Sequence, residues 1–118
     1  MLTLSPHHKV YVYTTAIDLR KAVNGLVVLL ADVYQQNPQT GDVFIFTNRQ
    51  RTIVKALCWD SNGFVLYYKR IENGRFHYSK YLQGDEIVIS TLQLKALLMG
   101  MDFHLIGKNT VENSDYFF

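Results

Sequence analysis

Residues 41–81 read GDVFIFTNRQRTIVKALCWDSNGFVLYYKRIENGRFHYSKY, and this stretch decides the fold. Four runs of β-branched and aromatic residues are separated by turn signals at residues 48–51, 61–63 and 73–74. β-Branched and aromatic side chains favour strands, and the Asn-Gly pairs supply the positive φ angles that tight hairpins need. The pattern predicts four antiparallel strands in a meander.

The turn signals also predict how these strands pair. If residues 62–63 form a two-residue loop, Trp59 lies opposite Leu66. The same register places Lys55 opposite Arg70. Because side chains alternate between the faces of a strand, each face of the sheet then mixes apolar and polar residues. Which face meets the helices is left open.

A strand and a long helix precede the meander. Residues 8–14 alternate between apolar and polar, which predicts a strand. Residues 18–36 carry an apolar stripe at helical spacing, with Asp18 as the N-terminal cap, and the width of the apolar surface predicts burial on two sides. Gly25 within this helix indicates close packing against a strand. The stripe consists of Leu19, Val23, Leu26, Leu30 and Val33.

A short strand and a second helix follow the meander. Residues 86–89 read EIVI, and Ser90 with Gln93 has the spacing of a capping box before a helix over residues 91–99. The prediction is one α+β domain over residues 1–106, a twisted antiparallel β-meander packed by one long and one short helix. Residues 107–118 are expected to form a loosely ordered tail.

Composition bounds the class of protein. With 118 residues the chain suits one domain, and its single cysteine, Cys58, excludes an internal disulfide and reads as a small core residue. The sequence shows no leader and no membrane-spanning run, so we expect a cytoplasmic protein without a membrane partner. The net charge is only +2, but residues 49–80 hold seven basic and two acidic residues, a local charge of +5.

The acidic residues do not indicate catalysis. A two-metal catalytic core for strand cleavage needs three carboxylates that gather the metal ions. Here Asp18 is assigned to a helix cap, and Asp42 and Asp60 to turns. Glu72 is assigned to a cross-strand pair with Arg75. The histidines lack the spacing of metal ligands, so the sequence predicts no catalytic residue, no metal site and no cofactor.

The basic residues of the meander are the candidates for a contact surface. Guanidinium and ammonium groups bind phosphates, and exposed aromatic side chains between them can stack on bases. A solvated rim without a partner is the alternative interpretation. The candidate contact residues are Arg49, Arg51, Lys55, Lys69, Arg70 and Arg75.

Five stretches carry a family pattern across residues 10–104. They are D-L-R-K with G-L at residues 18–26, G-D-V-F-I-F with N-R-x-R at 41–51, K-x-L-x-W-D-x-x-G-F at 55–64, K-R-I-E-N-G-R-F at 69–76 and L-L-M-G-M-D at 97–102. In these stretches the chain resembles the small TnpB-type accessory protein, the product of the second reading frame, encoded beside the transposase in bacterial insertion sequences of the sixty-six family. The motif residues assigned to structure are Asp18, Gly25, Trp59, Asp60, Gly63 and Gly74.

The chain also departs from that family. Many members continue the last meander motif with Trp-Pro, whereas this chain has His77-Tyr78-Ser79. Many end in a basic tail, whereas this one ends with acidic residues and Tyr116-Phe117-Phe118. A nucleic-acid role of the tail therefore does not carry over.

The resemblance implies a non-enzymatic accessory role in transposition, in which the protein acts with the separate transposase of the same element through protein contacts. DNA at the element ends is the second candidate partner. One alternative is a self-sufficient nucleic-acid-binding protein that uses residues 49–80. Another, less favoured, is a metal-dependent nuclease. The sequence leaves the oligomeric state open.

Overall fold

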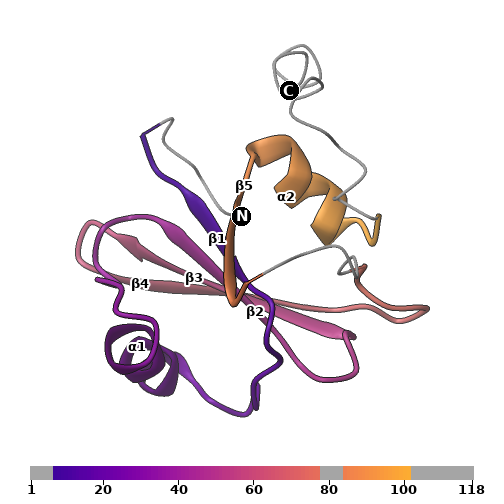
Figure 1. The fold of residues 1–118 in the computed structure, drawn as a ribbon, viewed down its shortest axis with the longest axis horizontal. Coiled ribbons are helices and arrows are strands. Elements are labelled where there is room, and N and C mark those ends of the chain that lie inside the picture. The colour runs from indigo at the N-terminus through magenta and orange to yellow at the C-terminus, as the bar shows by residue number, and fades with distance from the viewer. Residues whose placement is uncertain (1–6, 78–83, 102–118) are drawn as a thin grey trace.

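A five-stranded sheet forms the centre of the protein (Figure 1). The computed structural model describes residues 7–77 and 84–101. The strand order is β4-β3-β2-β1-β5, with β1 parallel to β2 and every other neighbouring pair antiparallel. The strands are β1 (Val10–Tyr13), β2 (Val43–Thr47), β3 (Ile53–Asp60), β4 (Gly63–Arg70) and β5 (Glu86–Ile89).

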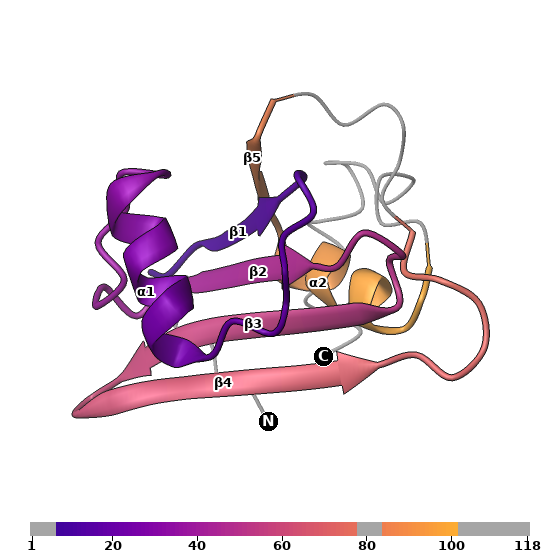
Figure 2. The same ribbon diagram turned by 90° about the horizontal axis from the view of Figure 1, so that it is seen from below.

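The two helices cover opposite faces of this sheet (Figure 2). Helix α1 (Val23–Asp32) packs Leu26 and Leu30 into one apolar cluster, and helix α2 (Thr91–Leu98) packs Leu94 and Leu97 into the other. The α1 cluster also holds Tyr13, Leu19, Phe44, Phe46 and Leu57. The α2 cluster also holds Val10, Val12, Val43, Ile45, Val54, Ala56, Cys58, Phe76, Ile89 and Ala96.

The α+β class is confirmed, and β2, β3 and β4 form the antiparallel core of the predicted meander. The sheet as a whole is mixed, because the chain crosses from β1 to β2 through α1 and arrives parallel. The fourth run forms no strand over its described residues up to His77. Instead, the backbone N–H of Ile71 bonds to the carbonyl of Thr52 (2.8 Å), and that of Phe76 to the carbonyl of Arg51 (2.7 Å). These bonds turn the segment back across the start of β3.

The β3–β4 hairpin is shifted by two residues from the predicted register. Trp59 lies opposite Phe64, and Lys55 lies opposite Tyr68, so the loop is Ser61-Asn62. Ser61 takes the positive φ (53°) that was assigned to the Asn-Gly pair. Because a shift of two preserves the alternation of side chains, the predicted division between the two faces is unchanged.

Helix α1 begins later than predicted, and Asp18 is not its cap. The cap position is Ala22, which has no side-chain hydrogen bond. Nζ of Lys55 donates to the carbonyl oxygens of Leu19 (2.6 Å) and Lys21 (3.0 Å). In a helix starting at Asp18 these carbonyls would accept bonds four residues on, so the lysine competes with the first helical turn.

The same helix is buried on one side, not two. Val28 and Val33 are exposed, and α1 ends at Asp32, where residues 18–36 had been expected to be helical. Gln35 just beyond it has a φ of 54°, a left-handed conformation that no helix continues. Gly25 does not meet a strand, since a Cβ there would lie 3.2 Å from Cβ of Lys21.

The second helix and its capping box match their predictions, whereas the short strand over residues 86–89 forms but does not join the meander region, where it had been expected. Ser90 Oγ accepts from the backbone N–H of Gln93 (3.1 Å), and Gln93 Oε1 accepts from that of Ser90 (2.9 Å). Gly100 follows the helix with a φ of 80°. β5 pairs with β1 at the sheet edge, away from the meander. The predicted tail over residues 107–118 lies outside the described residues.

Candidate functional site

Three segments distant in sequence enclose a surface depression of about 300 Å³. It is lined by Asp18, Leu19, Arg20, Asn48, Ile53 and Tyr68. The segments are the loop before α1, the β2–β3 turn and the end of β4. Arg20 and Tyr68 line this depression. Next to its other lining residues lie two exposed arginines: Arg49 follows Asn48 in sequence, and Arg70 pairs with Ile53 across β3 and β4. We call these four exposed side chains the Arg20–Tyr68 surface: Arg20, Arg49, Tyr68 and Arg70.

An ion pair fixes the loop before α1. The Arg20 guanidinium donates to both carboxylate oxygens of Asp18, at 2.7–3.0 Å, and the backbone N–H of Arg20 donates to the same carboxylate at 3.0 Å. These bonds lower the pKa of Asp18 to about 2 and raise that of Arg20. The Arg20 side chain is nevertheless 92% exposed. Asp18 thus orients a guanidinium that stays open to solvent.

Lys55 supports this loop from below. Its side chain is buried, with the ammonium bonded to the carbonyls of Leu19 and Lys21 and 5.7 Å from the centroid of the Tyr68 ring. Lys55 had been expected on the contact surface, but in the structure its side chain is buried and its ammonium group bonds to backbone carbonyls inside the protein. Lys55 positions the surface; it does not belong to it.

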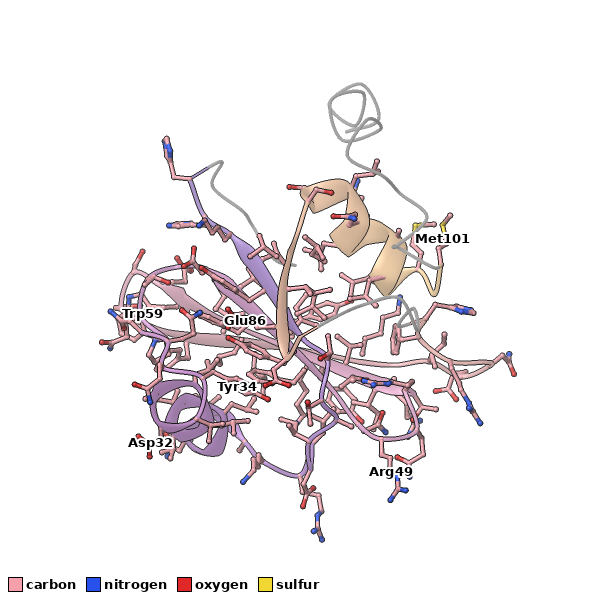
Figure 3. All side chains as sticks on the ribbon, in the orientation of Figure 1. Asp32, Tyr34, Arg49, Trp59, Glu86 and Met101 are labelled. Carbon is pink, nitrogen blue, oxygen red and sulfur yellow. The ribbon has the colours of Figure 1, made fainter. Side chains whose placement is uncertain are left out.

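The β2–β3 turn is held by Asn48. Its Oδ1 accepts from the backbone N–H groups of Thr52 (2.9 Å) and Ile53 (3.1 Å), and its Nδ2 donates to Thr52 Oγ1 (3.0 Å). Figure 3 shows Arg49 projecting from this turn, at the end of the sheet opposite Trp59. The turn presents an exposed arginine on a fixed backbone.

Arg51 has a structural place beside that turn. Its φ is 59°, its Nη2 donates to the carbonyl of Thr14 (2.9 Å), and its own carbonyl accepts from Phe76. It is half-buried. The guanidinium that was expected to reach a partner instead ties the end of β1 to the β2–β3 turn.

The other three predicted contact residues, Lys69, Arg70 and Arg75, lie in different places on the fold. Arg70 lies on the same face as Tyr68 and pairs with Glu72 at 3.2 Å, so the predicted Glu72–Arg75 pair is wrong. Lys69 points to the opposite face, where Nζ donates to the carbonyl of Leu98 at the end of α2. Arg75 is exposed but does not line the depression.

The motif residues assigned to structure have varied roles. The Trp59 ring meets that of Phe64 edge-on, with centroids 5.0 Å apart. Asp60 ends β3 opposite Gly63, and a Cβ on Gly63 would meet open space. Gly74 has a φ of 83°, the conformation for which its turn needs glycine.

The described part of the chain offers no metal site, because no group of three His, Cys, Asp or Glu side chains could hold an ion there. Burial raises the pKa of the Cys58 thiol, which lies 3.4 Å from the carbonyl of Gly41. A buried thiol with a raised pKa is a poor nucleophile. None of the helices in the described ranges is long and apolar enough to span a membrane.

Sequence reasoning did not select Arg20 or Asn48 as site residues, whereas Tyr68 was among the aromatic residues considered for stacking between the basic ones. Arg20 stands in the D-L-R-K stretch and Asn48 in the N-R-x-R stretch, so both belonged to the recognised motifs. The sequence does not show that Arg20 and Asn48 lie close together. The loop before α1 reaches the β2–β3 turn through long-range contacts, such as the bond from the Ile17 N–H to the carbonyl of Thr47 (3.0 Å).

Comparison with known proteins identifies relatives over most of the chain. The family model described as "IS66 Orf2 like protein" matches residues 8–108. The uncharacterized protein y4hO of Sinorhizobium fredii (strain NBRC 101917 / NGR234) is 32% identical over 103 residues, which cover 87% of this chain and 89% of the relative. The uncharacterized protein y4jC of the same strain is 27% identical over 104 residues, covering 88% of each. No solved structure matches.

Proposed function

The chain belongs to the IS66 Orf2-like family, and from that premise we propose that it is a non-catalytic accessory protein that binds the DNA of its insertion sequence through the Arg20–Tyr68 surface. The family supports a role in insertion-sequence transposition. In this proposal the separate transposase performs the strand chemistry, and the present protein supplies a DNA contact beside it.

The observation that carries the proposal is the grouping of three exposed arginines with one exposed tyrosine. Arg20, Arg49 and Arg70 come from three segments. Tyr68, 53% exposed, lines the same depression as Arg20 and shares its strand and face with Arg70, while Arg49 follows the lining residue Asn48. Guanidinium groups bind phosphates through paired N–H donors, and a tyrosine ring can stack on an unpaired base. Their common placement supports contact with a DNA backbone near an unstacked base.

The supports beneath this surface favour a binding role. Lys55 and Asn48 hold the two loops that carry Arg20 and Arg49. Two basic loops fixed in advance lose less conformational freedom on binding than mobile ones. Because the same bonds also serve stability, the proposal rests on the exposed side chains and not on their supports.

The test is equilibrium binding of labelled DNA from the element ends, as duplex and as single strands, measured by fluorescence anisotropy over a range of salt. The triple variant Arg20→Gln, Arg49→Gln, Arg70→Gln is expected to bind more weakly. The slope of log affinity against log salt for duplex should shrink by about 0.9 for each phosphate that the variant no longer binds. Tyr68→Ala should weaken single-strand binding more than duplex binding.

Lys9→Gln is a control that also removes one exposed positive charge. Lys9 precedes β1 beside the start of β2, whereas the depression lies at the end of β2. Equal weakening by Lys9→Gln and by each single arginine variant would show that only net charge matters, which contradicts the proposal. A triple variant that binds both kinds of DNA like the parent would also contradict it.

Two further outcomes separate the other candidate functions. If the triple variant keeps DNA binding but loses co-purification with the transposase, the surface binds that protein instead. If the parent cleaves DNA when Mg²⁺ or Mn²⁺ is added, the non-catalytic assignment is wrong. Tight, sequence-selective binding of the element ends without transposase would favour a self-sufficient nucleic-acid-binding protein.

A further inference from the structure

Strand β4 is a long sheet edge with an unusual composition. Among residues 7–77 and 84–101 it is the outermost strand on its side of the sheet (Figure 2), and its first six residues, 63–68, carry no charge. Val65 and Tyr68 are 43% and 53% exposed. Natural edge strands are commonly short, charged or interrupted by proline. The opposite edge, β5, follows that rule with four residues and Glu86.

The polar groups of β4 that point away from the sheet can be identified. In an antiparallel pair, alternate residues exchange both backbone bonds with the partner strand. The bond from Ile71 N–H to the carbonyl of Thr52 continues the β3–β4 register, so residues 69, 67 and 65 bond inward. The N–H and C=O groups of Phe64, Leu66, Tyr68 and Arg70 therefore point outward.

We propose that this edge pairs with the β4 edge of a second copy of the chain, antiparallel and centred on Leu66. Leu66 then lies opposite Leu66 of the second copy, Phe64 opposite Tyr68, and Gly63 opposite Lys69. Every residue that bonds across the interface belongs to the outward set. Two five-stranded sheets become one continuous ten-stranded sheet without breaking a bond of either copy.

Charge supports a second copy as the occupant. The basic residues Lys69 and Arg70 stand at one end of β4, while the turn at the other end begins with Asp60. An antiparallel pairing places each basic end beside the acidic turn of the other copy and keeps the two basic ends apart. A parallel pairing would bring the basic ends together, which is unfavourable.

The pairing also fixes the relative orientation of the two copies, namely on which side of the joined sheet each α1 lies. Outward groups belong to residues whose side chains lie on the α1 face, and residues opposite one another share a face. Both α1 faces, and with them both Arg20–Tyr68 surfaces, lie on the same side of the joined sheet. The dimer itself does not depend on the proposed function and is tested without DNA.

The first test is the mass of the full chain in solution, by sedimentation equilibrium. We expect twice the chain mass of 13.7 kDa. Val65→Lys places an ammonium diagonally across from Lys69 of the second copy and should raise the dimer dissociation constant about tenfold, since two symmetry-related lysines enter the interface. Val88→Lys, an exposed valine on the β5 edge, is the matched control and should leave the constant unchanged. Circular dichroism and melting temperature establish that both variants fold.

A second test depends on the register alone. Cysteines in a double variant, Gly63→Cys with Lys69→Cys, should form two bridges between copies under mild oxidation, because opposite residues of this pair lie about 4.5 Å apart at Cα. Within one chain the two positions are separated by about 20 Å of strand, so no internal bridge forms. Each single variant is the control and should not cross-link, since Gly63 faces Lys69 and neither residue faces itself.

Each contrary result overturns the proposal. If the chain stays at 13.7 kDa up to about 100 µM, it does not dimerise through β4. This result contradicts the proposal whether residues 102–118 or the transposase covers the edge instead. If Val88→Lys disrupts the dimer and Val65→Lys does not, the dimer forms through the β5 edge and not through β4. A dimer whose double-cysteine variant forms no bridge, while remaining folded, has another register or another interface.

Discussion

Nζ of Lys55 lies 2.6 Å from the carbonyl oxygen of Leu19, so a buried lysine of β3 holds a loop that lies 36 residues earlier in the chain. The same ammonium bonds to the carbonyl of Lys21. Because these two carbonyl oxygens accept from Lys55, they are not available for the backbone bonds of a longer helix. Lys55 thus holds the backbone just before α1, on the loop where Asp18 orients Arg20.

Lys55→Met should lower the free energy of unfolding by about 1–3 kcal/mol, because hydrogen bonds from a charged donor are removed inside the protein. Denaturant unfolding measures the change, and hydrogen exchange should speed up at residues 19–23. Lys69→Met is the matched control, since it removes a lysine-to-carbonyl bond at Leu98 on the other face. Faster exchange around residue 19 in the control as well would contradict a local role of Lys55.

The carboxyl of Asp18 should titrate with a pKa of about 2 in the folded protein, against its ordinary value of 3.8. Because the folded pKa is the lower one, the pair with Arg20 contributes stability above about pH 4, and this contribution is lost as pH falls towards 2. NMR titration measures the pKa. Arg20→Gln should return it towards 3.8, and an unchanged value would show that another group lowers it.

Leu26→Ala and Leu30→Ala should each lower the free energy of unfolding by about 2–5 kcal/mol, since both side chains are fully buried against the sheet. Val33→Ala, on the exposed side beyond the end of α1, should change it by less than about 0.5 kcal/mol. Thermal or denaturant unfolding distinguishes the two classes. Similar losses at all three positions would mean that α1 is covered on both sides.

Ser90→Ala should lower the free energy of unfolding by about 1 kcal/mol, because the variant lacks the side-chain bond that caps α2. Gln93→Ala removes the reciprocal bond to the backbone of Ser90 and should have a smaller effect. Thr91→Ala, an exposed neighbour, is the control. Because alanine has a higher helix propensity than threonine, Thr91→Ala should not destabilise α2, and a loss equal to that of Ser90→Ala would contradict a specific role of the cap.

Local signals in the sequence were sufficient where the structure is local. Ser90 and Gln93 are three residues apart and form the predicted capping box. The alternation along β3 and β4 assigned side chains to faces correctly even though the loop was misplaced by one residue, which shifts the register by two. The observed register sets Trp59 against Phe64, and this aromatic contact competes with the local preference of Asn-Gly for the turn.

Long-range bonds account for the errors in the site. Lys55 and Arg51 look like exposed cations in the sequence, and only the folded chain shows the carbonyls of Leu19 and Thr14 that they reach. Asp18 has the residue type of a helix cap, but the carbonyls of Leu19 and Lys21 that follow it bond to Lys55 and not to a helical turn. Arg49 and Arg70 were placed correctly on the exposed surface. Arg49 lies in a turn and Arg70 at the end of a strand, and such positions are commonly exposed to solvent whichever face of the sheet is covered.

The position of β1 between β2 and β5 has a consequence for the order in which the protein can form during synthesis. β2, β3 and β4 are contiguous in sequence and can pair as soon as they are made, whereas β1 must wait for its neighbours on both sides. Tyr13 receives its last partner, Glu86, from a strand 73 residues later. Pairings so distant in sequence form slowly. A nascent chain stalled before β5 therefore holds a half-paired β1, and the arrival of four residues, Glu86–Ile89, completes the sheet.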